Sequence, residues 1–186
     1  MEQLVMLAKA PYVKPTHSLP EGYSFVKFDG SDKDIADWKT IIMAEPAPLD
    51  GPDSCYHLMI ETFHDIVPTN DIYFVEDSNG IRVATFTVVS QPNGMGYLHM
   101  VHSMENQRGK GIGHAMAERS TQIAAERGHA SIILTTDDFR LPAIKTYLDA
   151  GYYPVVYGCR DNEVNTRWDA VFEKLGYPET VRYEKE

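Results

Sequence analysis

A glycine-rich stretch in the middle of the chain has the composition of an anion-binding loop. It reads Gln-Arg-Gly-Lys-Gly-Ile-Gly-His over residues 107–114 and stands between a strand-like and a helix-like segment. The first turn of a helix has backbone N–H groups without intrahelical partners and a partial positive charge, and glycine lets an anion approach them without a Cβ in the way. The spacing therefore predicts a phosphate site, with pyrophosphate as the expected ligand, where a helix begins near Gly111.

Two common nucleotide-binding loops do not fit this spacing. A Walker loop requires Gly-Lys-Ser/Thr, but Lys110 is followed by Gly111, so the magnesium-binding hydroxyl is missing. A dinucleotide-binding loop requires Gly-x-Gly-x-x-Gly, whereas the glycines stand at positions 109, 111 and 113. A glycine-rich turn that only joins a strand to a helix stays open as the alternative, because short glycine patterns are weak evidence by themselves.

The segments around the loop predict a βαβ unit. Residues 96–103 and 130–136 have the composition of strands, and the apolar residues between them keep helical spacing until Gly128. A strand, a helix and a second strand in this order usually place the two strands parallel. A further helix is expected from Pro142, and it ends at Gly151, where a C-terminal cap belongs.

Two of these motifs resemble those of the Gcn5-related N-acetyltransferase (GNAT) superfamily. Arg108-x-x-Gly111-x-Gly113 is similar to the acetyl-CoA signature, and residues 143–152 are similar to the second hallmark, which carries an alanine, a tyrosine and a Gly-aromatic pair. The resemblance implies an α/β fold (α+β in some schemes) with a mixed central sheet flanked by helices and acetyl-CoA in the splay between two parallel strands. The second half of the chain also resembles mycothiol-synthase-like members.

The same resemblance assigns the cofactor contacts. Backbone amides of the strand near Val101, His102 and Ser103 would pair with the pantetheine arm, and one of them would polarise the thioester carbonyl. The loop amides would hold the pyrophosphate, and the residues concerned are Arg108, Gly109, Lys110, Gly111, Ile112, Gly113 and His114. Arg140 stands where many members carry an asparagine; its guanidinium suits a CoA phosphate, and a plain surface position is the alternative.

Acetyl transfer to an amine requires a neutral nitrogen, a stabilised oxyanion and a proton for the departing thiolate. By resemblance Tyr147 is the acid, because a phenol donates a proton without carrying charge in the ground state; simple packing is the alternative. His99 is the candidate base, with an ordinary pKa of about 6.5, and a structural histidine is the alternative. Strand alternation places Tyr97, His99 and Val101 on one face and His102, the weaker candidate, on the other.

The rest of the chain predicts one domain preceded by an arm. Prolines at positions 11, 15 and 20 break regular structure, so we expect residues 1–20 to wrap the surface or meet a partner subunit, which leaves a homodimer open. The acetyltransferase-like domain then spans residues 21–186. Within it we expect further strands at 23–28, 72–76, 81–90 and 152–157, and helices after Ser31, at 56–66 and near 165–176. Asp137 and Asp138 are expected to cap the helix that follows them.

In this superfamily the first two helices and their loop usually frame the acceptor pocket, which corresponds to about residues 44–66. The acidic residues there that could attract an amine are Asp50, Asp53, Glu61 and Asp65. His57, Glu61 and His64 share one helical face at metal-ligand spacing, but the apolar stripe opposite makes this face a solvated surface. No metal is predicted.

Composition and charge exclude several other classes. The net charge of −10 opposes nucleic acids and anionic membranes and is compatible with a cationic amine. The sequence has no apolar run of bilayer length and no signal-peptide pattern, and its two cysteines, Cys55 and Cys159, are too few for a disulfide framework. We expect a cytoplasmic N-acetyltransferase that uses acetyl-CoA and a small-molecule amine. An acyl-CoA-binding module without turnover and a protein or peptide N-acetyltransferase are the alternatives.

Overall fold

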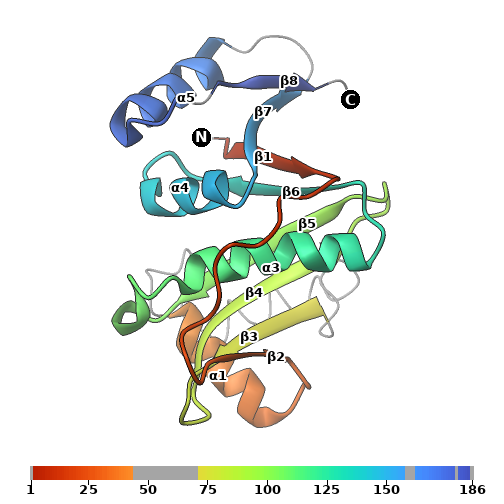
Figure 1. Cartoon of the computed structure of the whole chain (residues 1–186), viewed down its shortest axis with the longest axis vertical. Coiled ribbons are helices and arrows are strands. Elements are labelled where there is room, and N and C mark those ends of the chain that lie inside the picture. Colours follow the sequence, from red (N-terminus) through yellow and green to blue (C-terminus); the bar gives the residue numbers. More distant parts are fainter. Residues whose placement is uncertain (1, 44–70, 158–161, 179, 185–186) are drawn as a thin grey trace.

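The computed structural model describes residues 2–43, 71–157, 162–178 and 180–184, and in these ranges the chain forms a mixed eight-stranded sheet (Figure 1). The strand order is β2-β3-β4-β5-β6-β1-β7-β8. The strands are β1 (Leu4–Lys9), β2 (Ser24–Lys27), β3 (Ile72–Glu76), β4 (Arg82–Ser90), β5 (Gly96–Ser103), β6 (Ser131–Thr136), β7 (Tyr153–Tyr157) and β8 (Arg182–Glu184). The helices are α1 (Asp32–Ile42), the short 3-10 helix η3 (Glu105–Gln107), α3 (Ile112–Glu126), α4 (Leu141–Asp149) and α5 (Asn162–Leu175).

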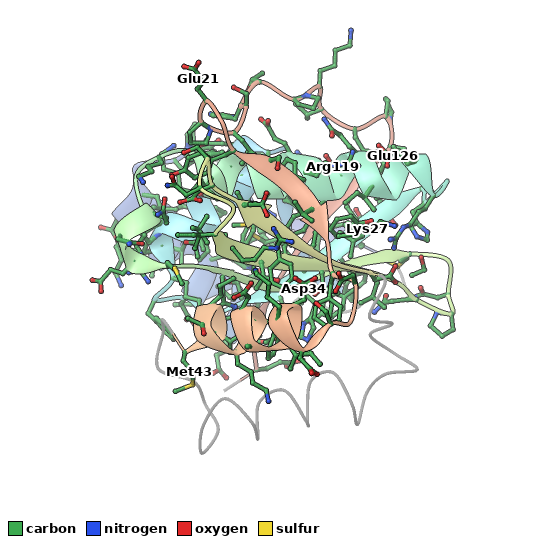
Figure 2. All side chains as sticks on the ribbon, turned by 90° about the horizontal axis from the view of Figure 1, so that it is seen from below. Glu21, Lys27, Asp34, Met43, Arg119 and Glu126 are labelled. Carbon is green, nitrogen blue, oxygen red and sulfur yellow. The ribbon has the colours of Figure 1, made fainter. Side chains whose placement is uncertain are left out.

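Helices cover the two faces of this sheet separately. Figure 2 shows α3 on one side and α1 on the other, with the strands between them. Buried side chains of α3, α4 and α5, such as Met116, Leu148 and Trp168, belong to one apolar cluster, whereas Trp38 and Ile41 of α1 belong to another. The expected mixed sheet with flanking helices is therefore confirmed.

The elements around the loop form where the sequence predicts them. β5 spans Gly96–Ser103, and α3 begins directly after Gly111, which adopts a left-handed conformation with φ of 79°. The expected helix after Ser31 is α1, in which the Ser31 hydroxyl accepts a hydrogen bond from the Asp34 amide at 3.2 Å. A hydroxyl at this position satisfies one of the amides that the first helical turn leaves open.

Strands β5 and β6 are parallel, as predicted, but pair only at their beginnings. The ladder joins Gly96 to Ile132 and Tyr97 to Ile133. Both strands continue well beyond these pairs, to Ser103 and Thr136. Two neighbouring strands that stop pairing while both continue must diverge, so the sheet opens towards the carboxyl ends of β5 and β6.

The expected alternation of side chains along β5 is wrong beyond His99. Thr87 pairs with His99 and Thr85 with His102, so β5 has one more residue than β4 between these pairs. This β-bulge contains Met100, whose φ of 52° is positive. Because directly opposed residues share a face and Thr85 and Thr87 are two positions apart, His99 and His102 lie on the same face.

The bulge also reverses the expected position of Val101. Val101 packs against the cluster on the α3 side of the sheet, whereas Met100 and Tyr97 pack against the α1 side. The prediction that Val101 shares a face with His99 is therefore wrong, and Tyr97 shares it as expected. Regular alternation holds only while the pairing stays in register, and a bulge shifts it by one residue.

The predicted N-terminal arm is wrong for its first half. Leu4–Lys9 forms β1 between β6 and β7, and Leu4 and Met6 are completely buried. The prolines break the chain only after this apolar run. The segment from residue 10 to 20 has no regular structure and crosses the outer side of α3 on its way to β2 (Figure 1).

In the C-terminal half two expectations were wrong and one strand was missed. Asn165 and Thr166 lie inside α5, which begins at Asn162, while Gly176 follows its last residue as predicted. The strand β8 was not expected. Neither Asp137 nor Asp138 is the N-cap residue of α4, which is Arg140, and the two carboxylate oxygens of Asp138 accept hydrogen bonds from Arg167 at 2.7 Å each.

Residues 44–70 lie outside the described residues. They include the expected helix at 56–66, the acidic residues Asp50, Asp53, Glu61 and Asp65, and the set of His57, Glu61 and His64. In the part of the chain that the structure describes, every helix is too short or too polar to cross a membrane.

Candidate active site

The candidate site lies at the carboxyl ends of β5 and β6. η3 and the glycine-rich loop lead from β5 into α3, and a short loop leads from β6 into α4, so both helices begin at the edge where the strands diverge. In open α/β sheets this is the edge at which ligands usually bind. The topology therefore brings together the predicted phosphate loop, the carboxyl half of β5 and the helix that carries Tyr147.

The glycines of the loop leave its backbone accessible. Gly109 and Gly111 have φ values of 76° and 79°, and a Cβ at either position would meet no atom within 4 Å. Ala115 donates the first backbone hydrogen bond of α3, to the Gly111 carbonyl at 3.0 Å, so the amides of residues 112–114 precede it. An anion can approach these amides because Gly111, the N-cap residue, offers no side-chain cap.

Gly113 has a different role from the other two glycines. A Cβ there would lie 3.7 Å from Cγ2 and 3.9 Å from Oγ1 of Thr146, which is an ordinary packing distance. Gly113 therefore faces α4 and lets the two helices approach each other, whereas Gly109 and Gly111 shape the loop itself.

Two cationic side chains lie in the loop. Lys110 donates to Gln107 Oε1 at 2.7 Å and to the Tyr23 hydroxyl at 3.3 Å, and its Nζ lies 5.8 Å from the centre of the Tyr23 ring. Arg108 is exposed. The loop thus carries positive charge beside the open end of α3, as an anion site requires.

His114, in the first turn of α3, ties the loop to its surroundings. Its Nε2 lies 3.1 Å from Oδ2 of Asp149 in α4, and its ring stacks on that of His17 with 4.5 Å between the centroids. His17 and Thr16 in turn bind Glu118, one turn further along α3. His114 therefore connects α3, α4 and the crossing N-terminal segment, and nothing tests its predicted cofactor contact.

Glu118 is a buried carboxylate that holds the crossing segment. Both its oxygens accept hydrogen bonds, from the Thr16 and His17 amides and from their side chains, at 2.8 to 3.1 Å. Burial alone would raise the pKa of Glu118, but the hydrogen bonds from His17 and Thr16 outweigh it and the pKa is lowered. The carboxylate is therefore charged at neutral pH and fixes the segment on α3.

Tyr147 is packed against the core beside the start of α3. Its side chain is 8% exposed and belongs to the same cluster as Ile112 and Met116. The ring meets that of Tyr152 edge to face at 5.9 Å, and the Tyr152 hydroxyl lies 2.7 Å from Ser120 Oγ. Packing fixes the Tyr147 ring, and its function as the acid stays a prediction.

His99 follows shortly after the last paired residues of β5 and β6. Its ring stacks on that of Tyr97, with centroids 5.1 Å apart and planes inclined by 26°. Burial, together with the nearby His102, lowers the pKa of His99 to about 4. At neutral pH the imidazole is therefore uncharged and retains a lone pair that can accept a proton.

Three threonines near this position, Thr85, Thr87 and Thr135, were not singled out by the sequence analysis. The Tyr97 hydroxyl lies 3.2 Å from Thr135 Oγ1 of β6, across the point where the strands separate. Thr85 and Thr87 of β4 stand opposite His102 and His99 and are completely buried. For Thr85 and Thr87, the signal was two threonines at alternate positions within the otherwise apolar run of residues 83–89.

Arg140 lies at the N-cap of α4, on the same edge of the sheet as the loop. Its Nε donates to Asp137 Oδ2 at 3.2 Å, and its guanidinium lies 5.4 Å from the centre of the Phe139 ring, which is 76% exposed. Its contact with a CoA phosphate stays a prediction. In the described residues, no three or more His, Cys, Asp or Glu side chains are grouped so that they could hold a metal ion.

Comparisons with known proteins agree with this geometry. Residues 36–152 match the model of a family described as "Acetyltransferase (GNAT) family". A search of curated proteins found no match. A structure of a GCN5-related N-acetyltransferase from Sphaerobacter thermophilus is similar, with a TM-score of 0.68 and 20% identity over 81% of this chain and 47% of that one.

Two further structures share the fold. A GCN5-related N-acetyltransferase from Kribbella flavida has a TM-score of 0.53 and 19% identity, over 82% of this chain and 54% of its own. A GCN5-related glucosamine N-acetyltransferase region of a fungal multi-domain β-N-acetylglucosaminidase has a TM-score of 0.59 and 10% identity, over 82% of this chain and 19% of its own. The chain therefore spans about half the length of the Sphaerobacter and Kribbella proteins.

Proposed function

Because the chain belongs to the acetyltransferase (GNAT) family, we propose that it transfers an acetyl group from acetyl-CoA to the primary amine of a small molecule, by direct attack in a ternary complex. Membership confirms the resemblance predicted from Arg108-x-x-Gly111-x-Gly113, and acetyl transfer is the general chemistry of this family. The similarity to mycothiol-synthase-like members stays a prediction. One observation carries the proposal: β5 and β6 separate beyond Tyr97 and Ile133, beside the open N-terminus of α3.

Acetyl-CoA fits the residues at this edge. The loop amides around Gly109 and Gly111 would hold the pyrophosphate, with Arg108 and Lys110 close to its charge. The pantetheine arm would enter between the diverging strands. The bulge in β5 leaves Met100 and Val101 out of register with β4, so backbone groups there are candidates to pair with the arm and to polarise the thioester carbonyl.

The chemical step assigns one role to each of two side chains. The amine nitrogen attacks the thioester carbon, a C–N bond forms and the C–S bond breaks. His99 accepts the proton that the amine loses, which its neutral imidazole permits. Tyr147 donates a proton to the departing thiolate. Both roles rest on the family resemblance together with the positions of β5 and α4 beside the splay.

A small-molecule acceptor is supported by two observations. The chain carries a net charge of −10, which favours the approach of a cationic amine. One of the fold neighbours is named for N-acetylation of glucosamine, a small amine. A protein or peptide acceptor and an acyl-CoA-binding module without turnover are the competing functions.

The test measures CoA release from acetyl-CoA with polyamines, amino acids, aminosugars, aminoglycosides and amine-bearing peptides as acceptors. We expect release that depends on a small amine and falls at least about 100-fold in Tyr147→Phe, with acetyl-CoA affinity unchanged. Release with peptides alone would favour the protein N-acetyltransferase. If acetyl-CoA raised the melting temperature without release from any acceptor, the binding module would be favoured.

A further inference from the structure

Four polar side chains form a continuous stripe across β4 and β5 on the α1 face of the sheet. We call Thr85, Thr87, His99 and His102 the polar stripe. The register pairs Thr87 with His99 and Thr85 with His102, so all four point to one side. The apolar cluster on that face includes Trp38, Ile41 and Phe74. Polar groups placed in an apolar layer require partners.

The two threonines of the polar stripe differ in how their hydroxyls are satisfied. Thr85 donates to the Tyr73 carbonyl at 3.0 Å, within its own sheet. Thr87 is completely buried, and its Oγ1 has no hydrogen-bond partner in the described part of the chain. A buried hydroxyl in this situation usually holds an ordered water or a ligand group, because leaving it unpaired is unfavourable.

We infer that Thr87 is a positioning residue for His99: its hydroxyl holds one ring nitrogen of the imidazole through a single water molecule, so that the other nitrogen faces the splay as the proton acceptor. This inference rests on the proposed function. Directly opposed residues of an antiparallel pair have Cβ atoms about 5 Å apart, so the Thr87 hydroxyl and the His99 ring are both within reach of one water molecule.

A base needs this kind of partner because neutral imidazole has two tautomers. One ring nitrogen carries the proton and the other accepts, and the hydrogen bond made by the first decides which nitrogen is free. Stacking on Tyr97 restrains the plane of the His99 ring, but it does not distinguish the two nitrogens. A water held by the Thr87 hydroxyl on the opposite strand contacts one of the two ring nitrogens, so the two nitrogens no longer have equivalent surroundings and the two tautomers differ in energy.

The experiment compares three variants by nitrogen NMR of the imidazole rings, without any acceptor present. The His99 signals are assigned by their loss in His99→Gln. We expect a single neutral tautomer in the wild-type protein, a mixture in Thr87→Val, and the wild-type tautomer in Thr87→Ser. Thr85→Val is the matched control, because it removes a hydroxyl of the same stripe that is already bonded to Tyr73, and it should leave His99 unchanged.

Turnover provides the second measurement. Thr87→Val should lower kcat about tenfold and leave the KM for acetyl-CoA unchanged, and Thr87→Ser should restore most of the rate. If Thr87→Val does not fold, Thr87→Cys tests the same hydroxyl. A wild-type tautomer in the Val or Cys variant would overturn the inference. Absence of turnover in every protein would contradict the proposed function alone, because the NMR result still decides the role of Thr87.

Discussion

The glycine-rich loop that we predict to bind phosphate and the polar stripe belong to the same candidate site but are built in different ways. The loop consists of neighbouring residues whose backbone geometry depends on Gly109 and Gly111, and it leads directly into α3. The polar stripe arises only when β4 and β5 pair around a bulge, which brings His102 to the side of His99. The first is a local property of the chain, and the second depends on how two strands are registered.

This difference separates binding from chemistry in the proposed enzyme. Changes in the loop should affect acetyl-CoA affinity, whereas changes at His99 and Thr87 of the stripe should affect the rate, and those at His99 also the response to pH. If changes in the loop and changes in the stripe both altered the acetyl-CoA affinity, or both altered the rate, this separation of binding from chemistry would be wrong.

The largest effect is expected when the candidate base is removed. His99→Gln should lower kcat/KM about 100-fold, because proton transfer by a positioned base contributes about 100-fold or more. Since burial and His102 lower the pKa of His99 to about 4, the wild-type rate should show no enzyme-side break near an ordinary histidine pKa. The check is to measure kcat/KM against pH with two acceptor amines of different pKa. A break that moves with the acceptor belongs to the amine, and a break that stays at the same pH belongs to a group of the enzyme.

Two outcomes would contradict the role of His99 as the base. A break near pH 6.5 that persisted in His99→Gln would assign the titration to another group. An unaltered rate in the variant would leave His99 as a packed residue on the α1 face.

The same histidine should make folding stability depend on pH. The pKa of His99 is about 4 in the folded protein and about 6.5 for an ordinary histidine, so the unfolded chain binds more protons between these values. Stability should therefore fall as pH drops through this window, by about 2 kcal/mol after allowance for partial exposure. Urea unfolding at pH 7 and at pH 4.5 should show this loss in the wild type and a smaller loss in His99→Gln. Equal losses in the two proteins would mean that His99 is not desolvated.

A smaller effect is expected when the loop is changed at one glycine. Gly111→Ala places a Cβ at a φ of 79° beside the amides that we propose hold the pyrophosphate, so the acetyl-CoA dissociation constant should rise about tenfold. Gly128→Ala is the matched control, since Gly128 has a φ of 74° and equally open surroundings at the other end of α3. Calorimetric titration measures both. Equal affinity losses would mean that backbone strain, and not the loop, causes the effect.

The sequence was sufficient for the elements whose signals are local. β5 has the predicted bounds, and α3 begins beside the predicted glycine, because strand alternation and helix caps depend on neighbouring residues. These elements also lie within residues 36–152, the part that matches the family. The strands β1 and β8 and the start of α5 lie outside that range, and the expectations there were wrong or missing.

Two of the wrong expectations, the position of β1 and the alternation along β5, have one physical origin. The position of β1 between β6 and β7 and the bulge opposite Thr85 and Thr87 depend on pairing between segments far apart in the chain. Periodicity along one strand does not contain that information, because a shift by one residue exchanges the two faces. For this reason the predicted alternation on β5 was correct for Tyr97 and His99 but not for Val101 and His102.

The smallest effect is expected at the segment that crosses α3. Glu118 holds Thr16 and His17 through its buried carboxylate, so Glu118→Gln removes the charge and one acceptor and should cost about 1–2 kcal/mol of unfolding free energy. The pKa of Glu118 is lowered from its ordinary value of 4.5, so this contribution is present above that pH and should be lost as pH falls through the folded pKa. Glu126→Gln is the control, because Glu126 is an exposed partner of Arg119 on the same helix (Figure 2) and should cost less than about 0.5 kcal/mol.

The acetyl-CoA affinities of Glu118→Gln and Glu126→Gln decide whether the crossing segment, residues 10–20, supports the glycine-rich loop. His17 stacks on His114 in the first turn of α3, and Tyr23, just after the segment, accepts a hydrogen bond from Lys110, so a loosened segment reaches the loop through these contacts. If the segment serves stability alone, Glu118→Gln should change the dissociation constant less than about threefold, which corresponds to about 0.6 kcal/mol. A larger loss of affinity, without one in Glu126→Gln, would show that the N-terminal segment supports the phosphate loop, and the loop would then no longer be a purely local feature of the chain.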